Sequence, residues 1–432
     1  MRPVIRFAAA VLVVLPFLAA CTDNDTSRLL APGQANAATL NLPPGDIYYR
    51  IDPYANQFVE ISAGYWHTCA RTKAGAMYCW GVNTWGELGV VPATTTLCGQ
   101  YGYGQQPCIT KPTRVTASAT VNGVVTNLTT ATTIRAGGDH TCALGPGGVA
   151  WCWGTNWYGE AGDGNGAFLV NAPTPTPVAG GLSFTSIDVG GFQTCGTSSS
   201  QIFCWGQVRF DKPQHLTPFS YSNWWGWGTG ISVGDNNVCA RSAAGSWSCF
   251  GDNRYGQLGL DPAIWPYFDA PLGLTATNTA PRVEAGHYTT CADEADGTVQ
   301  CWGDNSSGQL GVGSFDSFSF NPQTVGGGLQ LHGVTLGTNH ACALDPNGLA
   351  FCWGSNSLGQ IGNGSVGGAV RSPVQVSTSM TFRALAAGSD HTCGIGTDNH
   401  FYCWGDNFKG QLGQPIGAPL HGQLTPIQTQ DP

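Results

Sequence analysis

Residues 387–393 read Ala-Gly-Ser-Asp-His-Thr-Cys, and residues 403–413 read Cys-Trp-Gly-Asp-Asn-Phe-Lys-Gly-Gln-Leu-Gly. Versions of the first stretch recur along the chain and end in cysteines 69, 142, 195, 239, 291, 342 and 393. Successive cysteines in this series are separated by 73, 53, 44, 52, 51 and 51 residues. A period near 50 residues with glycine and aromatic signatures is typical of a β-propeller or a solenoid. We therefore predict seven copies of one structural unit.

The sixth copy shows what one unit contains. Residues 341–344 and 349–353 are short apolar runs on either side of Asp-Pro-Asn-Gly, and this turn sequence predicts a β-hairpin. We expect another strand before the hairpin, as at residues 382–386. Before that strand lies a Pro-x-x-Val element, which suits an outer edge strand because an edge strand can lack one ladder hydrogen bond. Four antiparallel strands per unit predict an all-β, seven-bladed propeller.

The repeated motifs Gly-x-x-His-Thr, Trp-Gly-x-Asn and Gly-Gln-Leu-Gly resemble the repeats of the regulator of chromosome condensation family, over residues 58–413. This resemblance implies a seven-bladed propeller and, for nuclear members, guanine-nucleotide exchange on a small GTPase. We do not expect that exchange activity here, because the chain reads as an exported protein and has no basic tail. The third copy departs most from the pattern, since it lacks Gly-Gln-Leu-Gly after residues 204–206, and the fourth has Phe250 where the others have tryptophan.

Cysteines occupy both arms of every predicted hairpin. Facing positions on adjacent strands are close enough to bridge, and an exported protein is oxidised, so we predict one disulfide per blade. Zinc sites instead need closely spaced cysteines that converge on one point. Two further cysteines lie in an insertion at residues 92–112, which we expect them to staple. The predicted pairs are Cys69 with Cys79, Cys98 with Cys108, Cys142 with Cys152, Cys195 with Cys204, Cys239 with Cys249, Cys291 with Cys301, Cys342 with Cys352, and Cys393 with Cys403.

The seventeenth cysteine follows a secretory signal. Residues 1–20 combine two arginines with an apolar run, and the sequence Leu-Ala-Ala-Cys that ends at Cys21 resembles the bacterial lipobox. We expect cleavage before Cys21, attachment of lipid to its thiol, and a location in the cell envelope, with the outer membrane favoured. Residues 21–45 read as a flexible linker, and residues 46–432 as the propeller.

The end of the chain suggests a way to close the ring. Residues 424–429 resemble the Pro-x-x-Val segment at residues 372–376, yet no further copy follows them. We predict that residues 426–429 add an outer strand to the first blade, with residues 46–51 as the alternative.

No catalytic, metal or cofactor site stands out from the repeats. The net charge is −9 with 10% charged residues and no Lys/Arg cluster, which argues against nucleic-acid binding. Histidines 67, 140, 340 and 391 share one repeat position, where the other copies have Gln193, Asn237 and Thr289. A metal-binding ring is one interpretation, but we favour a structural hydrogen bond, because every substitute can also form one. Six tryptophans, at 80, 153, 205, 302, 353 and 404, read as packing between blades.

We expect function to reside where the copies differ, because loops on a rigid scaffold are free to vary. Aromatic residues in such loops predict a surface for a protein or a glycan partner. The alternatives are an enzyme inhibitor, as in secreted propellers of similar construction that block β-lactamases, and a lyase or hydrolase acting on polysaccharide. We expect a monomer with no cofactor and no enzymatic activity. The predicted surface consists of Tyr101, Tyr103, Trp224, Trp225, Trp227, Trp265, Tyr267 and Phe268, with a further aromatic loop at Phe315, Phe318 and Phe320.

Overall fold

The computed structural model describes residues 56–90, 96–99, 104–121, 124–166, 170–208, 213–220, 227–273, 280–314, 316–416, 422–430 and 432. The chain divides into a unit of residues 1–52 and a unit of residues 53–432, and all described residues belong to the second. The proposed signal, Cys21 and the linker lie outside the described residues. Within the described ranges, no helix has the length and hydrophobicity needed to cross a bilayer.

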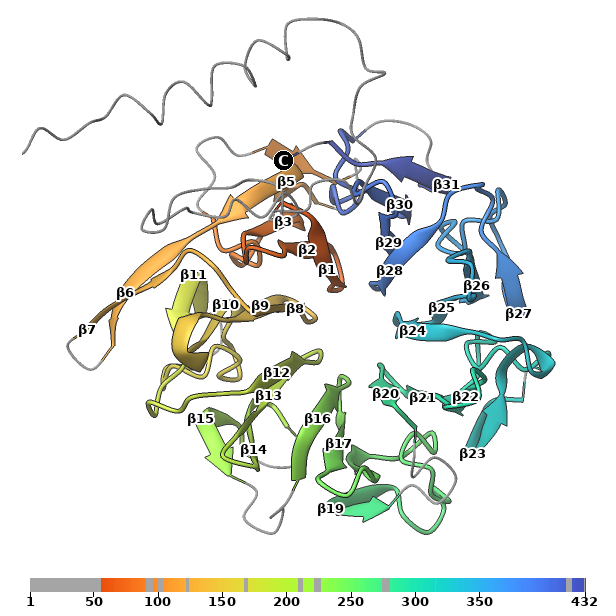
Figure 1. Cartoon of the computed structure of the whole chain (residues 1–432), viewed down its shortest axis with the longest axis horizontal. Coiled ribbons are helices and arrows are strands. Elements are labelled where there is room, and N and C mark those ends of the chain that lie inside the picture. The colour runs from red at the N-terminus through yellow and green to blue at the C-terminus, as the bar shows by residue number, and fades with distance from the viewer. Residues whose placement is uncertain are drawn as a thin grey trace, which may run out of the picture. The chain divides into compact units, whose positions relative to one another are not determined.

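The second unit is a propeller of seven antiparallel sheets around a central axis (Figure 1). Each sheet has four strands, except that a short fifth strand extends the first. From the innermost strand outward, the first three blades are β1 (Phe58–Ala63), β2 (His67–Thr72), β3 (Met77–Val82), β5 (Gln106–Val115) and β4 (Thr96–Cys98); β8 (Thr133–Ala136), β9 (His140–Leu144), β10 (Ala150–Thr155) and β11 (Asn171–Pro177); and β12 (Ser186–Val189), β13 (Gln193–Ser198), β14 (Gln201–Gly206) and β15 (His215–Ser220).

The other four blades have the same order. They are β16 (Trp227–Val233), β17 (Asn237–Ser242), β18 (Trp247–Asp252) and β19 (Tyr267–Gly273); β20 (Arg282–Ala285), β21 (Thr289–Asp293), β22 (Val299–Asp304) and β23 (Phe318–Thr324); β24 (His332–Leu336), β25 (His340–Leu344), β26 (Ala350–Ser355) and β27 (Ala369–Gln375); and β28 (Phe382–Ala387), β29 (His391–Gly396), β30 (Phe401–Gly405) and β31 (Gln423–Gln428). A separate ribbon of β6 (Ala117–Val121) and β7 (Val124–Leu128), and the short 3-10 turns η3 (Pro146–Gly148) and η4 (Val325–Gly327), complete the described elements. The predicted seven-bladed propeller is confirmed.

The glycine after each repeat tryptophan or Phe250 makes a β-bulge. In all seven blades the register between the third and fourth strands shifts at this glycine. Gly405 is representative, with a φ of 94°. A Cβ atom there would lie 2.5 Å from the carbonyl oxygen of Asp390. Only glycine tolerates both the left-handed backbone and this close approach. This requirement explains why glycine follows the tryptophan, or Phe250, in every copy.

All eight predicted disulfides are present. Within each blade the two cysteines lie directly opposite on the second and third strands, as with Cys142 and Cys152. Their Cα atoms are 4.0–4.1 Å apart in the seven blades. Cys98 and Cys108 join β4 to β5 at a Cα separation of 5.7 Å. One bridge per blade is therefore confirmed, together with the staple in the insertion.

Every fourth strand contains at least one proline: β5, β11, β15, β19, β23, β27 and β31. Proline lacks the N–H that would pair with a further strand, so the outer edges of the six four-stranded blades are protected against edge-to-edge association. In the first blade β5 is covered by β4. The predicted outer position of the Pro-x-x-Val elements is confirmed. Their assignment to a place ahead of the hairpin is wrong, because the proline-containing strand follows the hairpin and completes the same blade.

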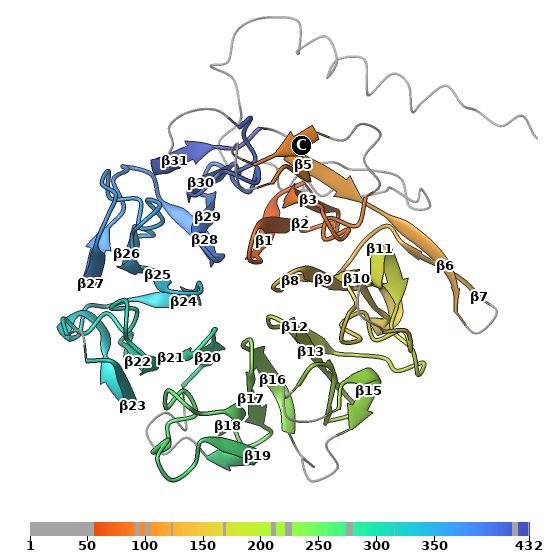
Figure 2. The ribbon, with the colours of Figure 1, turned by 180° about the vertical axis from the view of Figure 1, so that it is seen from behind.

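The prediction for ring closure is also wrong. Residues 426–429 do not join the first blade, because β31 pairs with β30 inside the seventh, and the first blade takes its fourth strand from β5. Side chains close the ring instead. The Phe58 and Phe401 rings lie 4.2 Å apart, and the Phe58 amide donates to Asn399 Oδ1 at 2.8 Å. The first and seventh blades therefore meet as any two neighbouring blades do (Figure 2).

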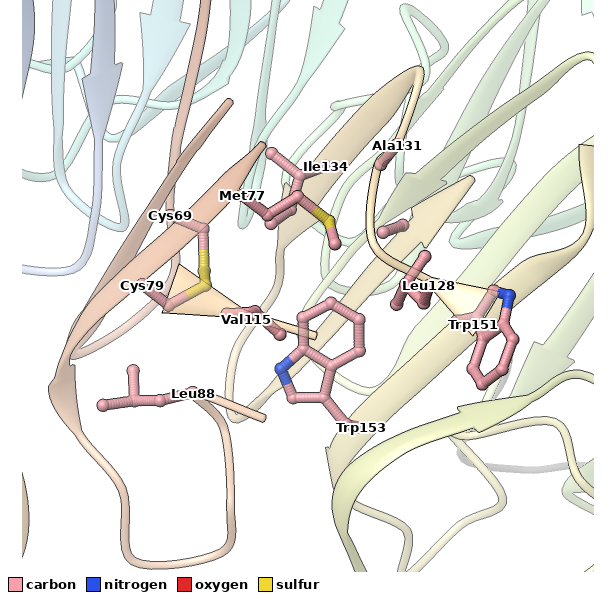
Figure 3. Packing of buried hydrophobic residues seen from close by; sticks show 11 residues of the cluster. Cys69, Met77, Cys79, Leu88, Val115, Leu128, Ala131, Ile134, Trp151 and Trp153 are labelled. Carbon is pink, nitrogen blue, oxygen red and sulfur yellow. A yellow bond between two sulfur atoms is a disulfide. The ribbon is translucent and has the colours of Figure 1, made fainter. Parts of the chain in front are cut away.

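The core lies between neighbouring blades. Trp153 of the second blade packs among Leu88, Val115 and the Cys69–Cys79 bridge of the first (Figure 3). Burying one indole removes roughly 150–250 Å² from water, which is worth about 4–6 kcal/mol at 25 cal/mol per Å². The six repeat tryptophans have 0% exposure, which bears out their packing role.

Candidate functional site

The predicted binding surface is only partly described. Trp265 and Tyr267 of the fourth blade are 48% and 40% exposed, whereas Phe268 packs against the core cluster beside Trp302. Trp227 begins β16. Phe318 is exposed and Phe320 is half-buried. Residues that lie outside the described ranges are Tyr101, Tyr103, Trp224, Trp225 and Phe315.

The histidine position joins one blade to the next. His340 Nε2 lies 2.9 Å from Thr392 Oγ1 of the following blade, and Thr392 Oγ1 donates to the Gln360 carbonyl at 3.0 Å. The Trp404 indole donates to that same carbonyl at 2.9 Å. Equivalent bonds join His67 to Thr141, His140 to Thr194, and His391 to Thr68, the last of which crosses the closure of the ring. The expected structural role of these histidines is confirmed.

Burial lowers the pKa of each of these histidines. The values fall to about 3 for His67 and His391 and to about 4 for His140 and His340. Each Nδ1 is buried without a hydrogen-bond partner, so a second proton would find no acceptor there. Neutral imidazoles held in this way act as structural hydrogen-bond donors. Among the described residues, no group of three or more side chains is suited to hold a metal ion.

At two blade interfaces, the loss of a repeat donor is matched by the loss of its acceptor in the neighbouring blade. The fifth blade has Thr289 in place of histidine, and the sixth blade has Ala341 where five of the seven blades have the accepting threonine. Thr289 Oγ1 donates instead to the carbonyl of Asp304 within its own blade. In the same way, Phe250 has no indole N–H, and the copy before it lacks the segment whose carbonyl would accept one.

One end of the propeller carries the residues that differ between copies. Strands alternate in direction, so the connections between the first and second strands and between the third and fourth strands emerge at the same end of each blade. We call this end the variable face. Its axial loops contribute residue pairs 65–66, 138–139, 191–192, 235–236, 287–288, 338–339 and 389–390, and its outer loops contribute 84–85, 157–158, 254–255, 306–307, 357–358 and 408–409.

The outer loop of one blade contacts the axial loop of the next. Lys409 Nζ lies 3.1 Å from the ring centroid of Trp66. The Tyr158 and Phe192 rings are 5.8 Å apart. The same two positions hold Tyr255 and Tyr288, whose rings are 4.7 Å apart. A constant scaffold therefore presents one variable pair at each of these blade interfaces.

Aromatic side chains concentrate on one part of this face. The Trp85 and Trp157 rings lie 5.1 Å apart, and both are partly exposed. On the fourth blade the Arg254 guanidinium lies 5.7 Å from the Tyr267 ring, so the predicted Trp265–Tyr267 patch adjoins the Tyr255 and Tyr288 pair. By contrast, the fifth to seventh blades mostly contribute small polar residues: Ser306, Ser307, Thr338, Asn339, Ser357 and Ser389.

The centre of the variable face is closed by a hydrogen-bonded cluster. The Tyr65 hydroxyl reaches from the first blade to the fourth and donates to Asp235 Oδ2 at 2.6 Å. His287 Nδ1 contacts the same carboxylate oxygen. Burial and the Asp235 charge raise the pKa of Tyr65, which stays protonated. These side chains line one end of an axial cavity of about 630 Å³.

Three charged residues of the cavity wall, Glu60, Arg135 and Asp188, form one network with Arg71. Glu60 accepts hydrogen bonds from Arg71, at 2.7 Å, and from Arg135 of the next blade. Arg135 also lies 3.2 Å from Asp188 of the third blade. Although burial opposes it, the charges of Arg135 and Arg71 hold the pKa of Glu60 below its usual value. This network links three blades and leaves no unpaired charge among those four residues.

The residues of the variable face were not among those predicted from the sequence as the binding surface. That surface was built from insertions and aromatic runs, whereas Trp85, Tyr158 and Tyr255 lie inside the repeat itself. A signal for the face is nevertheless present in the chain, because the two positions before each Gly-Gln or Gly-Glu hold different residues in nearly every copy.

Comparisons with known proteins agree with this architecture. A family model described as the regulator of chromosome condensation (RCC1) repeat matches residues 58–86, 282–309, 332–360 and 382–411, and a second model of that description matches residues 347–395. The ultraviolet-B receptor UVR8 of Arabidopsis thaliana is 27% identical over 316 residues, which cover 69% of this chain and 70% of UVR8.

Two further relatives match over different extents. The probable E3 ubiquitin-protein ligase HERC6 of Homo sapiens is 32% identical over 189 residues, which cover 43% of this chain but only 18% of HERC6. The crystal structure of Prp20p from Saccharomyces cerevisiae, described together with its binding to Gsp1p and histones, superimposes with a TM-score of 0.66 at 17% identity. That superposition covers 88% of both chains and shows that the fold is shared.

Proposed function

Because the chain belongs to the RCC1-like repeat family, we propose that it is a non-catalytic propeller that binds a partner protein on its variable face. The observation that carries this proposal is the ring of contacts between outer and axial loops. The bonds beneath the loops recur from blade to blade, while the residues at the surface change from Lys409 and Trp66 to Tyr158 and Phe192. Constant support under varied side chains is how scaffolds present recognition surfaces.

The chemistry of the face suits a protein partner. Binding energy at protein interfaces concentrates in tryptophan, tyrosine and arginine side chains that bury apolar area while keeping a polar group. Trp85, Trp157, Tyr255 and Arg254 supply these side chains here, and Tyr255 is 38% exposed. Their positions on closed, disulfide-bridged blades reduce the entropy lost on binding. The protein binding described for Prp20p supports the same class of partner.

Site-specific crosslinking tests this function. A photoreactive benzoylphenylalanine in place of Trp85 or Tyr255 should crosslink one and the same protein in the native extract, and the same group at Asn347, in a hairpin turn at the opposite end of its blade, should not. The captured protein, once purified, should bind the native chain, and the Trp85→Ala/Trp157→Ala variant should bind it at least tenfold more weakly with unchanged melting. Equal crosslinking from Asn347, or equal binding by the double variant, would reject the face. Capture of a glycan alone would favour the glycan-binding alternative.

We also propose that the protein is exported and anchored by lipid at Cys21 in the bacterial cell envelope. The eight disulfides support an oxidising compartment, because such bridges are rare in reducing ones. The test is radiolabelled palmitate incorporation together with membrane fractionation. Native chain should incorporate label and sediment with membranes, and Cys21→Ser should do neither. Label retained by the variant would contradict this assignment.

A further inference from the structure

Among the three described aspartates of the axial loops, one half-buried carboxylate has no hydrogen-bond partner. Asp139 lies in the axial loop between β8 and β9, where its backbone carbonyl accepts from Thr155. Its side-chain Oδ1 is buried and has no hydrogen-bond partner. Within the described ranges the structure shows no hydrogen bond or ion pair to either oxygen of this carboxylate. A carboxylate oxygen withdrawn from water without a partner is costly, so Oδ1 of Asp139 needs an explanation.

The other two aspartates of the axial loops are satisfied. Asp235 accepts from Tyr65 and contacts His287. Asp390, which occupies the same repeat position as Asp139, accepts from Ser389 Oγ at 3.1 Å and from Gln360 Nε2 at 3.3 Å. Asp139 therefore lacks the hydrogen bonds that its equivalent, Asp390, accepts. It lies in the aromatic part of the face.

The chain does not supply a cation to this position. Lys409 is close enough for its charge to act on Asp139, but its ammonium group lies over the Trp66 ring and forms no ion pair with that carboxylate. Burial raises the pKa of Asp139 to about 6, a rise that Lys409 opposes and the Asp235 charge favours. The Asp139 side chain is thus mostly ionised at pH 7 and above. The pKa of the neighbouring Glu87 is raised to about 8 by burial and by the Asp139 charge, so Glu87 is mostly neutral at pH 7.

The surroundings match a guanidinium group. Outer-loop residues contact the axial loop of the next blade at three interfaces. Trp85 and Asp139 occupy the equivalent positions of the first and second blades, so we expect them to lie side by side. Lys409 on Trp66 shows that an aromatic ring of this face accommodates a cation. Arginine combines both interactions, because its planar group pairs with a carboxylate and stacks on an indole.

We propose that Asp139 is the anchor for an arginine side chain of the partner, and that this arginine is held between the carboxylate and Trp85. The inference rests on the proposed function and specifies the chemistry of the partner. It predicts a trade-off: Asp139 is kept at a cost to the free protein because it is satisfied only in the complex.

The stability of the free protein is the first measurement. At pH 8, Asp139→Asn should raise the midpoint of denaturant unfolding, because an amide is less costly to bury than an unpaired carboxylate. At pH 4 the gain should disappear, since the native carboxylate is then protonated. A lower midpoint for the variant at pH 8 would show that Asp139 has an ordinary structural role and would overturn the proposal.

Binding to a defined probe is the second measurement. A fluorescein-labelled decaarginine peptide should bind the native chain more tightly than decalysine and decaglutamate do. Asp139→Asn should weaken decaarginine binding at least tenfold. The matched control Asp345→Asn removes the same charge from a hairpin turn at the opposite end of its blade, and it should change binding less than twofold. Equal effects of the two variants, or equal affinity for decaarginine and decalysine, would overturn the proposal.

A third variant separates this inference from the proposed function. If Trp85→Ala weakens decaarginine binding and Asp139→Asn does not, the face binds but the arginine anchor is wrong. If neither substitution weakens decaarginine binding, and the crosslinks from Trp85 and Tyr255 are also absent, the variable face itself is not the binding surface.

Discussion

Replacing His340 by glutamine should change how stability depends on pH. The imidazole of His340 is buried and joins the sixth blade to the seventh through Thr392. Because the Thr392 hydroxyl already donates to the Gln360 carbonyl, Nε2 must carry the proton and donate to that hydroxyl. Any further proton must go to Nδ1, which has no partner. Glutamine already fills this position at Gln193, where its Nε2 donates to the Gly234 carbonyl at 2.9 Å.

The magnitude follows from the two pKa values. Burial lowers the pKa of His340 from 6.5 to about 4, and each pH unit of difference corresponds to about 1.36 kcal/mol. The unfolded chain takes up the proton near pH 6.5 and the native protein does not, so stability is intact above pH 6.5 and is lost as the pH falls toward 4. His340 alone should therefore remove about 3 kcal/mol of unfolding free energy between pH 7 and pH 4.

Denaturant unfolding with the disulfides intact measures this effect. The native chain and His340→Gln should be compared at half-unit steps from pH 8 to pH 4. The difference in unfolding free energy between them should be constant above pH 7 and should then shift toward the variant by about 3 kcal/mol. NMR of the His340 ring provides a direct check, since its signals should not titrate above pH 5. A difference that stays constant with pH, or a ring that titrates near 6.5, would refute the reasoning.

Three other changes test the blade interfaces and the bridges. Burial, together with the charge of Asp139, raises the pKa of Glu87 to about 8, so Glu87→Gln should match the native chain near pH 5 and be more stable above pH 8 in denaturant titrations. Phe401→Ala empties the contact at the ring closure and should cost about 3–5 kcal/mol; a loss below about 1 kcal/mol would mean that this packing does not hold the ring shut. Cys342→Ser/Cys352→Ser should lose about 2–3 kcal/mol without loss of far-ultraviolet dichroism, and non-reducing peptide mapping should still find Cys142 linked to Cys152.

Local chemistry made several features predictable. Each blade has two cysteines nine or ten residues apart around a tight turn, and facing positions on two strands explain all seven pairs. The structure contains these pairs. Hydrogen-bonding substitutes at the histidine position, such as Gln193, indicated a structural bond, and Thr392 receives that bond. Both conclusions needed only the period of the repeat and the chemistry of one side chain.

Other features depended on which segments meet in space. The final segment resembles the outer strands, but its partner could not be read from that resemblance. The place beside β3 in the first blade is taken by β5, so β31 pairs with β30. Packing of Phe58 on Phe401 then closes the ring without an exchanged strand. The proline-containing strands were assigned to the wrong side of the hairpin for the same reason, since strand order within a sheet is a tertiary property.

The sequence by itself determined the number of blades, the bridges within them and the side chains that fasten one blade to the next, because these features arise from patterns that repeat over short distances. Only the tertiary structure decided how the ring closes and which residues share its variable face. Trp85, Asp139 and Tyr255 are far apart along the chain, and none of them stands out within its own copy. They come to one end of the molecule because successive antiparallel strands return equivalent loops to the same side of every blade.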